Sequence, residues 1–343
     1  MSQVNRTATS SKHIDRNRKL TFTFNGKQYQ GFDGDTLASA LLANGVDVVG
    51  RSFKYARPRG IITSDSQEPN AIFQIGSTQA TTIPNPRATQ VELYDGLVAS
   101  STNGWPNVDF DLMSTVGKLG GSMMPVGFYY KTFMFPQSLW KSYEHLIRKG
   151  AGLGASPKQN DPDSYDKMHH HCDVMIIGGG PAGLAAALSA AESGARVIIC
   201  DEQNEFGGSL LCSKQQIEGL LPSHWVDKTI AALSKMANVL MLTRSTAFGY
   251  YDHNLVGINE QRTDHLGEHQ LQHSRQRLHK VRAKQVILAT GAHERPLVYA
   301  NNDEPGCMLA NAVSTYINRY DAVPGNESVF MKTNDNAYTT AIN

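Results

Sequence analysis

The feature that most constrains the fold is a glycine-rich turn between two segments of regular pattern. Residues 173–177, DVMII, have the length and composition of a buried strand, and the turn GGGPAG follows directly at 178–183. The next segment, LAAALSAAES, repeats apolar residues every three to four positions, which predicts a helix that ends at Gly194. A second apolar run at 196–200 completes a strand–helix–strand unit. This order predicts a Rossmann-like α/β domain.

Each glycine of the turn has a separate expected role. Gly178 permits the tight turn, Gly180 lets the backbone approach a pyrophosphate, and Gly183 lets the helix pack closely on the strand. The amides of the first helical turn, including that of Ala182, together with the helix dipole, would hold the diphosphate. The turn therefore predicts a dinucleotide site.

An acidic residue stands where the second strand ends. Asp201 is expected to accept hydrogen bonds from a ribose diol, and Glu202 and Gln203 are the neighbouring candidates. A carboxylate here disfavours NADP, because it would repel the 2′-phosphate. NAD or FAD is therefore the expected cofactor.

Composition excludes several other classes of protein. Charged residues make up 18% and hydrophobic residues 40% of the 343, which is typical of a globular protein. The formal net charge of +1 gives no general attraction to nucleic acid. No apolar run approaches the ~20 residues that cross a bilayer. The expected partner is therefore a small molecule, with no nucleic acid and no membrane.

The cysteines and histidines predict neither a disulfide framework nor a metal site. The four cysteines lie far apart with no C-x-x-C pair, which favours a reducing, cytoplasmic location. The run His169-His-His171 lies in extended chain, where adjacent side chains do not converge on one ion. The polar, histidine-rich region 257–284 is typical of an exposed hairpin. We therefore assign no metal ligand.

The N-terminal half predicts a small α+β unit. Residues 20–32 alternate apolar and polar side chains around Asn25-Gly26, which predicts a hairpin. A helix is expected from Leu37, capped by Asp35 or Thr36. Residues 1–19, which are rich in Lys and Arg, are expected to form a disordered tail. The aromatic-rich and linker residues 104–171 are expected to be irregular chain with one short helix.

Longer segments carry a family resemblance. The stretches GRSFKYARPRGI, EPNAIF and GFYYKTFMFP, followed by the glycine-rich unit and LATGAHERPLVYANNDEPGCMLA, closely resemble the α subunit of heterotetrameric sarcosine oxidase. The resemblance covers nearly all of residues 20–343. Opine oxidase and hydrogen cyanide synthase, which are related amine- and amino-acid-oxidising complexes, share parts of it.

The resemblance implies that residues 20–103 form a β-grasp domain of the 2Fe–2S ferredoxin type. No cysteine precedes Cys172, so four thiolate ligands cannot be assembled there, and we expect no iron–sulfur cluster. The place of the cluster loop is taken by residues 51–59, RSFKYARPR. We expect its cations to pair with acids across the domain boundary, while Phe53 and Tyr55 pack.

Two further motifs resemble the two-dinucleotide-binding flavoprotein superfamily. The pair Gly207-Gly208 follows the acidic residue, and 286–291, VILATG, is a short strand that ends in an A-T-G turn. By that resemblance, Ser209 would lie near the diphosphate and Gly291 under the cofactor. The backbone around Phe248 would lie against the edge of the adenine ring.

The same resemblance implies a function. The family complex demethylates sarcosine oxidatively to glycine, with peroxide and a folate-linked one-carbon unit as further products. The β subunit holds the catalytic FAD, a covalent FMN lies at the α/β interface, and the α subunit carries a non-catalytic NAD. We therefore expect partner β, γ and δ subunits and assign no catalytic residue. The alternatives are the α subunit of a related amine-, opine- or amino-acid-oxidising flavoenzyme complex and a noncatalytic nucleotide-binding fragment.

The chain is expected to be incomplete at its C-terminus. The Rossmann-like FAD/NAD(P)-binding domain is assigned to 172–325. Residues 326–343 then read as a strand, a turn and the start of a helix that a complete crossover would continue. We expect a truncated chain that is not active alone.

Overall fold

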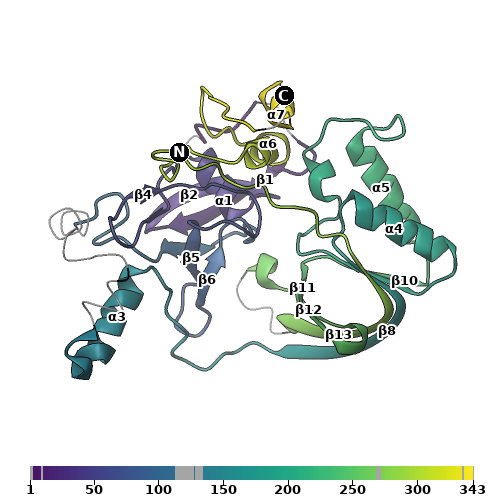
Figure 1. Cartoon of the computed structure of the whole chain (residues 1–343), viewed down its shortest axis with the longest axis horizontal. Coiled ribbons are helices and arrows are strands. Elements are labelled where there is room, and N and C mark those ends of the chain that lie inside the picture. Colours follow the sequence, from purple (N-terminus) through teal and green to yellow (C-terminus); the bar gives the residue numbers. More distant parts are fainter. Residues whose placement is uncertain are drawn as a thin grey trace. The chain divides into compact units, whose positions relative to one another are not determined.

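A computed structural model of the chain describes residues 3–8, 11–112, 127, 134–267, 272–333 and 336–342. Residues 113–126 and 128–133 of the aromatic-rich segment predicted at 104–171 lie outside the described ranges. The chain divides into two compact units (Figure 1). The first unit comprises Met1–Asp161 and Glu294–Asn343, and the inserted unit comprises Pro162–His293. None of the described helices is both long and apolar enough to cross a membrane.

The first unit contains a five-stranded sheet in the order β2-β1-β7-β5-β6. Its strands are β1 (Asp15–Phe24), β2 (Lys27–Asp33), β5 (Ile72–Ile75), β6 (Ile83–Arg87) and β7 (Val98–Ser101). The predicted hairpin is confirmed: β1 and β2 pair antiparallel, and Asn25 and Gly26 both have positive φ. β1 pairs parallel with β7. This is the β-grasp arrangement that the family resemblance implies.

Helix α1 (Leu37–Ala43) is buried along its whole length in this unit. The prediction of a capped helix is confirmed. The Thr36 hydroxyl accepts a hydrogen bond from the Ser39 amide, and the Ser39 hydroxyl accepts one from the Thr36 amide. The short strands β3 (Gly50–Arg51) and β4 (Pro58–Arg59) form a separate ladder. Helix α3 (Trp140–Gly150) follows the 3-10 turn at Gln137–Leu139 and is the short helix predicted for this segment.

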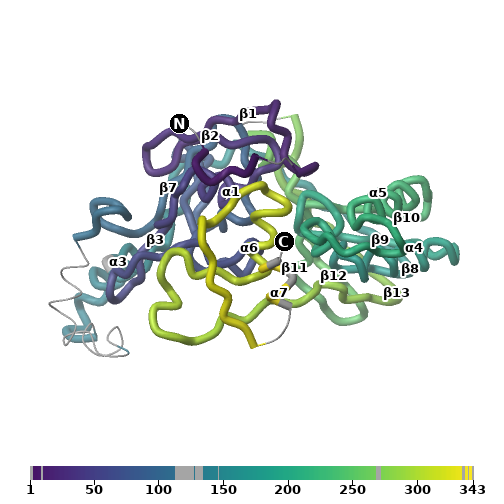
Figure 2. Tube along the Cα trace, turned by 90° about the horizontal axis from the view of Figure 1, so that it is seen from above, coloured from purple at the N-terminus to yellow at the C-terminus, as the bar shows by residue number. Residues whose placement is uncertain are grey.

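The segment 294–322 packs in the core of the first unit, although the sequence placed it in the dinucleotide domain. Helix α6 (Ala310–Asn318) lies beside α1 in both views (Figures 1 and 2). The Tyr316 side chain is fully buried there, and its hydroxyl donates to the Thr63 carbonyl at 2.8 Å. The Glu294 carboxylate accepts from the first amides of α6. Helix α7 (Asn336–Ile342) follows later in the chain.

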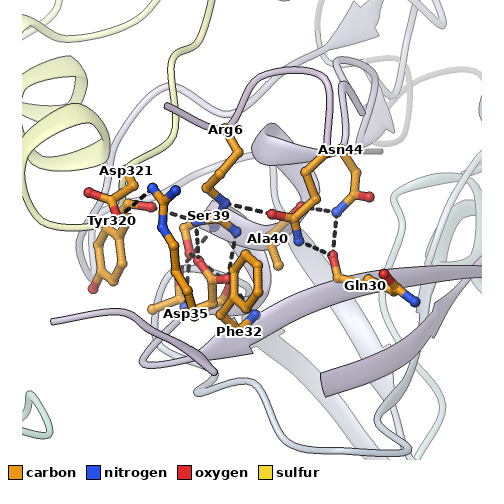
Figure 3. Close-up of polar contacts among 12 residues, drawn as sticks. Arg6, Gln30, Phe32, Asp35, Ser39, Ala40, Asn44, Tyr320 and Asp321 are labelled. Atoms are coloured by element: carbon orange, nitrogen blue, oxygen red, sulfur yellow. Dashed lines mark hydrogen bonds and ion pairs between the residues drawn. The ribbon is translucent and has the colours of Figure 1, made fainter. Parts of the chain in front are cut away.

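The prediction of a disordered basic tail at 1–19 is wrong for its described residues. The Arg6 guanidinium makes a bidentate ion pair with Asp35, at 2.6 and 3.1 Å, and donates to the Tyr320 carbonyl at 2.6 Å (Figure 3). The two side chains are only 5% and 0% exposed. The buried carboxylate also accepts from the Ser39 hydroxyl. This burial depends on long-range packing, so basic composition alone could not indicate it.

The inserted unit contains a six-stranded sheet in the order β10-β9-β8-β13-β12-β11. The strands are β8 (Tyr165–Ile177), β9 (Val197–Cys200), β10 (Val239–Leu242), β11 (Ser245–Tyr251), β12 (Leu255–Gln261) and β13 (Gln276–Leu288). The neighbours from β10 to β13 pair parallel, and β13, β12 and β11 form an antiparallel meander. The Rossmann-like prediction is confirmed, and the polar region 257–284 does contain a hairpin.

Helices α4 (Pro181–Glu192) and α5 (Pro222–Leu233) lie together on one face of this sheet (Figure 1). Their buried face meets the parallel strands through Ile176, Leu184, Ile199 and Val226. β8 begins earlier than the sequence indicated, because its polar first half pairs residue by residue with β13. Residues 165–168 are therefore strand because their backbone pairs with β13, although their composition resembled that of a linker.

Candidate dinucleotide-binding site

The glycine turn lies at the carboxyl end of β8. Gly178 has a φ of +103°, and a Cβ there would collide with the carbonyl of Ala289. The Ala289 amide in turn donates to the Ile177 carbonyl at 2.8 Å, so the A-T-G turn lies directly against the glycine turn. Gly291, at the end of that turn, is exposed. A Cβ at Gly183 would collide with the Gly178 carbonyl oxygen, which explains the close start of α4.

The N-terminus of α4 has no side chain that caps its first amides. Gly180 is its N-cap, with no side-chain cap, and Pro181 follows at the first helical position. The first helical hydrogen bond runs from the Leu184 amide to the Gly180 carbonyl. The amides of Ala182 and Gly183 precede it and so have no partner within the helix. Because a Cβ at Gly180 would meet nothing closer than Gly208 Cα at 3.9 Å, the surface here is open to an anion.

A second glycine pair braces the turn. The Gly207 amide donates to the Gly179 carbonyl at 2.8 Å, and Gly207 has a φ of +135°. A Cβ at Gly208 would lie 2.9 Å from Gly180 Cα, so this backbone approach also requires glycine. Ser209 follows at the start of a 3-10 turn and is exposed. The structure therefore brings Ser209 next to the glycine turn.

Asp201 also lies at the turn, although its carboxylate faces the protein backbone. Oδ2 accepts from the Gly179 amide at 2.6 Å, and Oδ1 accepts from the Gln203 amide at 2.8 Å. Glu202 is exposed, and Gln203 is half-buried. The acidic residue therefore interacts with the phosphate-binding turn itself, which the spacing did not indicate.

Two residues next to the acid were missed by the sequence analysis. The Arg244 amide donates to the Gln203 carbonyl at 2.8 Å, and the Ser245 amide donates to the Asp201 carbonyl at 2.7 Å. Arg244 has a φ of +51°, where the chain turns from β10 into β11. Neither residue belongs to a motif, and only the pairing of distant segments brings them to this site.

Phe248 lies on the meander, in β11. Its ring packs over Gly257 of β12, where a Cβ would approach it to 2.8 Å, and the side chain is 56% exposed. It lines an open cavity of about 600 Å³ with residues of β8, β12 and β13. Its placement beside an adenine stays a prediction.

Two cysteines of the inserted unit, Cys172 and Cys200, are buried and unreactive. Burial raises the pKa of the Cys172 thiol to about 11 and that of Cys200 to about 12. Both thiols therefore stay protonated at neutral pH and are poor nucleophiles. Across the described ranges, no group of three or more histidine, cysteine or acidic side chains has a geometry that could hold a metal ion.

Two histidines instead form a hydrogen-bonded chain across three strands. His170 Nε2 lies 2.9 Å from His279 Nδ1, and His279 Nε2 lies 3.0 Å from a carboxylate oxygen of Glu260. His279 is 2% exposed. When His279 is neutral and donates to Glu260, its Nδ1 accepts the hydrogen bond that His170 Nε2 donates.

This chain predicts a pH dependence of stability. Burial, followed by the charge of His279, lowers the pKa of His170 below its ordinary 6.5. The unfolded chain therefore binds more protons at this residue as the pH falls. The stabilisation is expected to be complete above about pH 6.5 and to be lost as the pH falls below it. Urea unfolding between about pH 8 and pH 5 measures the decline, and His170→Gln should flatten it. An unchanged slope in that variant would contradict the assignment.

The loop 51–59 has no exposed block of free cations. In the first unit, Arg57 Nε and Arg59 Nη1 pair with the Asp303 carboxylate at 2.8 and 2.7 Å. The expected pairing with acids is therefore found, but within one unit. The two aromatic residues pack only in part, since Phe53 and Tyr55 remain 40% and 52% exposed.

Comparison with known proteins places these features in a family. A model described as 2Fe–2S iron-sulfur cluster binding domain matches residues 17–104, and one described as pyridine nucleotide-disulphide oxidoreductase matches residues 172–329. Sarcosine oxidase subunit alpha of Rhizobium meliloti (strain 1021) is 49% identical over 332 residues. By sequence, this chain belongs to the sarcosine oxidase α-subunit family. The match covers 96% of this chain and 33% of that protein.

A second α subunit, from Corynebacterium sp. (strain P-1), is 39% identical over 95% of this chain and 29% of its own length. The chain thus spans about a third of the length of these α subunits. The crystal structure of L-proline dehydrogenase from P. horikoshii covers 95% of this chain and 50% of its own, with a TM-score of 0.58 and 20% identity. That likeness shows the fold alone.

The two matched families imply a 2Fe–2S cluster and a dinucleotide, and the residues present fit only the dinucleotide. Residues 17–104 contain no cysteine, so the thiolate ligands of a 2Fe–2S cluster are missing from the domain that matches the cluster-binding model. The second domain implies a FAD or NAD(P) cofactor. The uncapped amides of α4 and the open surface at Gly180 fit a diphosphate.

Proposed function

We propose that this chain is the nucleotide-binding α component of a sarcosine-oxidising flavoenzyme complex. The observation that carries the proposal is the glycine turn at 178–183, which Ala289, Gly207 and Asp201 fix while no side chain caps the first amides of α4. The homology to sarcosine oxidase α subunits supports the class of complex.

The resident nucleotide in this proposal is NAD, with FAD as the alternative. The amides at Gly180, Ala182 and Gly183 hold the diphosphate, and Ser209 and Gly291 border it. The acidic pair Asp201-Glu202 lies at the ribose end and disfavours NADP. The nucleotide has a structural role, and the redox chemistry belongs to flavins held with the β subunit.

The remaining parts of the proposal concern the complex. Partner β, γ and δ subunits complete it in the cytoplasm, sarcosine is demethylated to glycine, and a folate receives the one-carbon unit. The N-terminal β-grasp domain contributes a scaffold without a cluster. This chain alone is expected to oxidise no sarcosine, because the proposal assigns the redox flavins to the β subunit.

The test is to identify the nucleotide that purifies with the chain. An absorption spectrum and mass analysis of the released ligand should show about one NAD per chain and no flavin band. A stoichiometric flavin band would replace NAD with FAD, and a chain with no affinity for either would contradict the site. Peroxide release from sarcosine by the isolated chain would contradict the need for a β subunit.

A further inference from the structure

An open cavity of about 600 Å³ lies on the sheet of the inserted unit, at the opposite end of β8 from the glycine turn. Its volume is within the range of about 300–1,000 Å³ that is usual for small-molecule sites. Strands β8, β13, β12 and β11, which lie side by side in Figure 1, all contribute to its lining. No side chain of this cavity belongs to the proposed dinucleotide site.

The strand register places the lining side chains on one face of the sheet. Residues directly opposite each other in neighbouring strands point to the same face. One residue from each of the four strands lies in a single row across the sheet: Lys167, Leu278, Asn259 and Thr246. The row therefore brings a cation, an apolar side chain, an amide and a hydroxyl to one surface.

The apolar floor of the cavity is formed by Phe248 and Leu278. The Phe248 ring lies over Gly257 of β12, where an added Cβ would approach the ring to 2.8 Å. Glycine at this position therefore leaves room for the ring on the surface of the sheet. The Phe248 side chain is 56% exposed, so its ring is available for contact with a planar aromatic ligand.

Three uncharged polar side chains border this floor. Gln276 is two positions before Leu278 in β13, so it lies on the same face. In the part of the chain that the structure describes, the side chains of Thr246, Asn259 and Gln276 form no hydrogen bond. Side-chain amides can donate hydrogen bonds to a carboxylate. A few convergent polar groups beside an apolar surface are typical of a ligand site.

The charge at the cavity favours an anion. Lys280 is two positions beyond Leu278, so its side chain lies on the same face as that of Lys167. Both lysines are exposed, and neither forms an ion pair with another described residue. Asp166 also lines the cavity, but its carboxylate accepts from the Ser274 hydroxyl at 2.6 Å and from Arg277 at 3.1 Å. Among the described residues at the cavity, the unpaired charge is therefore positive.

We propose that this cavity binds a planar aromatic carboxylate. The ring of the ligand contacts Phe248 and Leu278, and its carboxylate pairs with the Lys167 amine. The amides of Asn259 and Gln276 donate the remaining hydrogen bonds. The adenine predicted beside Phe248 would contact the backbone at the outer edge of β11, the last strand of the sheet, whereas this ligand uses the side-chain face.

The test uses 1-naphthoate as the probe and 1-naphthalenemethanol as its uncharged counterpart, with binding to the wild-type chain measured by saturation-transfer NMR. Naphthoate should bind about tenfold more tightly than the alcohol. Lys167→Met keeps most of the aliphatic stem and should bring this ratio to about one without weakening the alcohol. Phe248→Ala should weaken both ligands about tenfold. Lys284→Met removes an exposed lysine that pairs with Asp173 at 3.0 Å, and this matched control should change neither affinity.

The outcomes separate this inference from the dinucleotide site. A wild-type chain that binds neither probe, or binds both equally, contradicts the inference, and so does a tenfold preference that persists in Lys167→Met. Saturating ADP should not displace naphthoate, and displacement would make the cavity part of the dinucleotide site. A chain that binds ADP and not naphthoate overturns this inference alone, whereas one that binds naphthoate and not ADP overturns the dinucleotide site alone.

Discussion

Gly183→Ala is expected to abolish nucleotide binding and to destabilise the inserted unit. The added Cβ collides with the Gly178 carbonyl, so α4 must move away from the strand end. Backbone overlap of this kind costs about 3 kcal/mol of unfolding free energy. Losing two charge-assisted amide contacts lowers affinity for ADP about a hundredfold or more. Titration measures the affinity, and hydrogen exchange of the amides in α4 and β9 measures the stability.

Gly180→Ala is the matched variant, and the contrast is the sharper test. Gly180 has a φ of −73°, which alanine adopts without strain, and its Cβ has open space on the protein side. The variant should fold with a stability within about 1 kcal/mol of the wild type. Its methyl group occupies the surface proposed for the diphosphate, so affinity should still fall about tenfold. Equal affinity in both variants and the wild type would contradict the site.

Arg6→Ala is expected to destabilise the first unit strongly. Removing the guanidinium leaves the Asp35 carboxylate, 0% exposed, without its charge partner, and the Tyr320 carbonyl loses a donor. Breaking a buried pair in this way costs about 3–5 kcal/mol. Hydrogen exchange of the amides in α1 and β1 should show this loss, while the amides of the inserted unit should keep their protection.

Arg18→Ala is the control for the loss of a charge near the N-terminus. Arg18 pairs with Asp33 at 3.1 Å, but the side chains are 67% and 43% exposed. Such a pair contributes less than about 1 kcal/mol. Adding Asp35→Asn to Arg6→Ala should recover part of the lost stability, because a neutral amide is cheaper to bury than an unpaired carboxylate. A double variant no more stable than Arg6→Ala would contradict the explanation.

The parts predicted from sequence depend on local pattern. The hairpin at Asn25-Gly26 and the helix capped by Thr36 follow from turn and capping chemistry within a few residues. The need for glycine at 178 and 183 could be predicted because one tight turn leaves no room for a side chain. In the structure, a Cβ added at either position would collide with a backbone carbonyl. Order, spacing and residue type are sufficient where the interacting atoms are close in sequence.

The parts that sequence did not predict depend on contacts between distant segments. No local period indicates that Arg6 is buried against Asp35, or that Tyr316 belongs to the core of the first unit. The orientation of the Asp201 carboxylate is set by the Gly179 amide, and Arg244 reaches the site through strand pairing. These features require the fold before they can be assigned.

The division of the first unit between both ends of the chain bears on how the protein is made. Arg6 binds the Tyr320 carbonyl across 314 positions, whereas the inserted unit is one continuous stretch. At roughly 5–20 residues per second, the ribosome needs about 15 s or more to supply that partner. The inserted unit is therefore expected to fold first. Until the C-terminal segment is made, strands β1 to β7 of the first unit lack part of their apolar packing. In the cell, those nascent strands are where chaperones would be needed most.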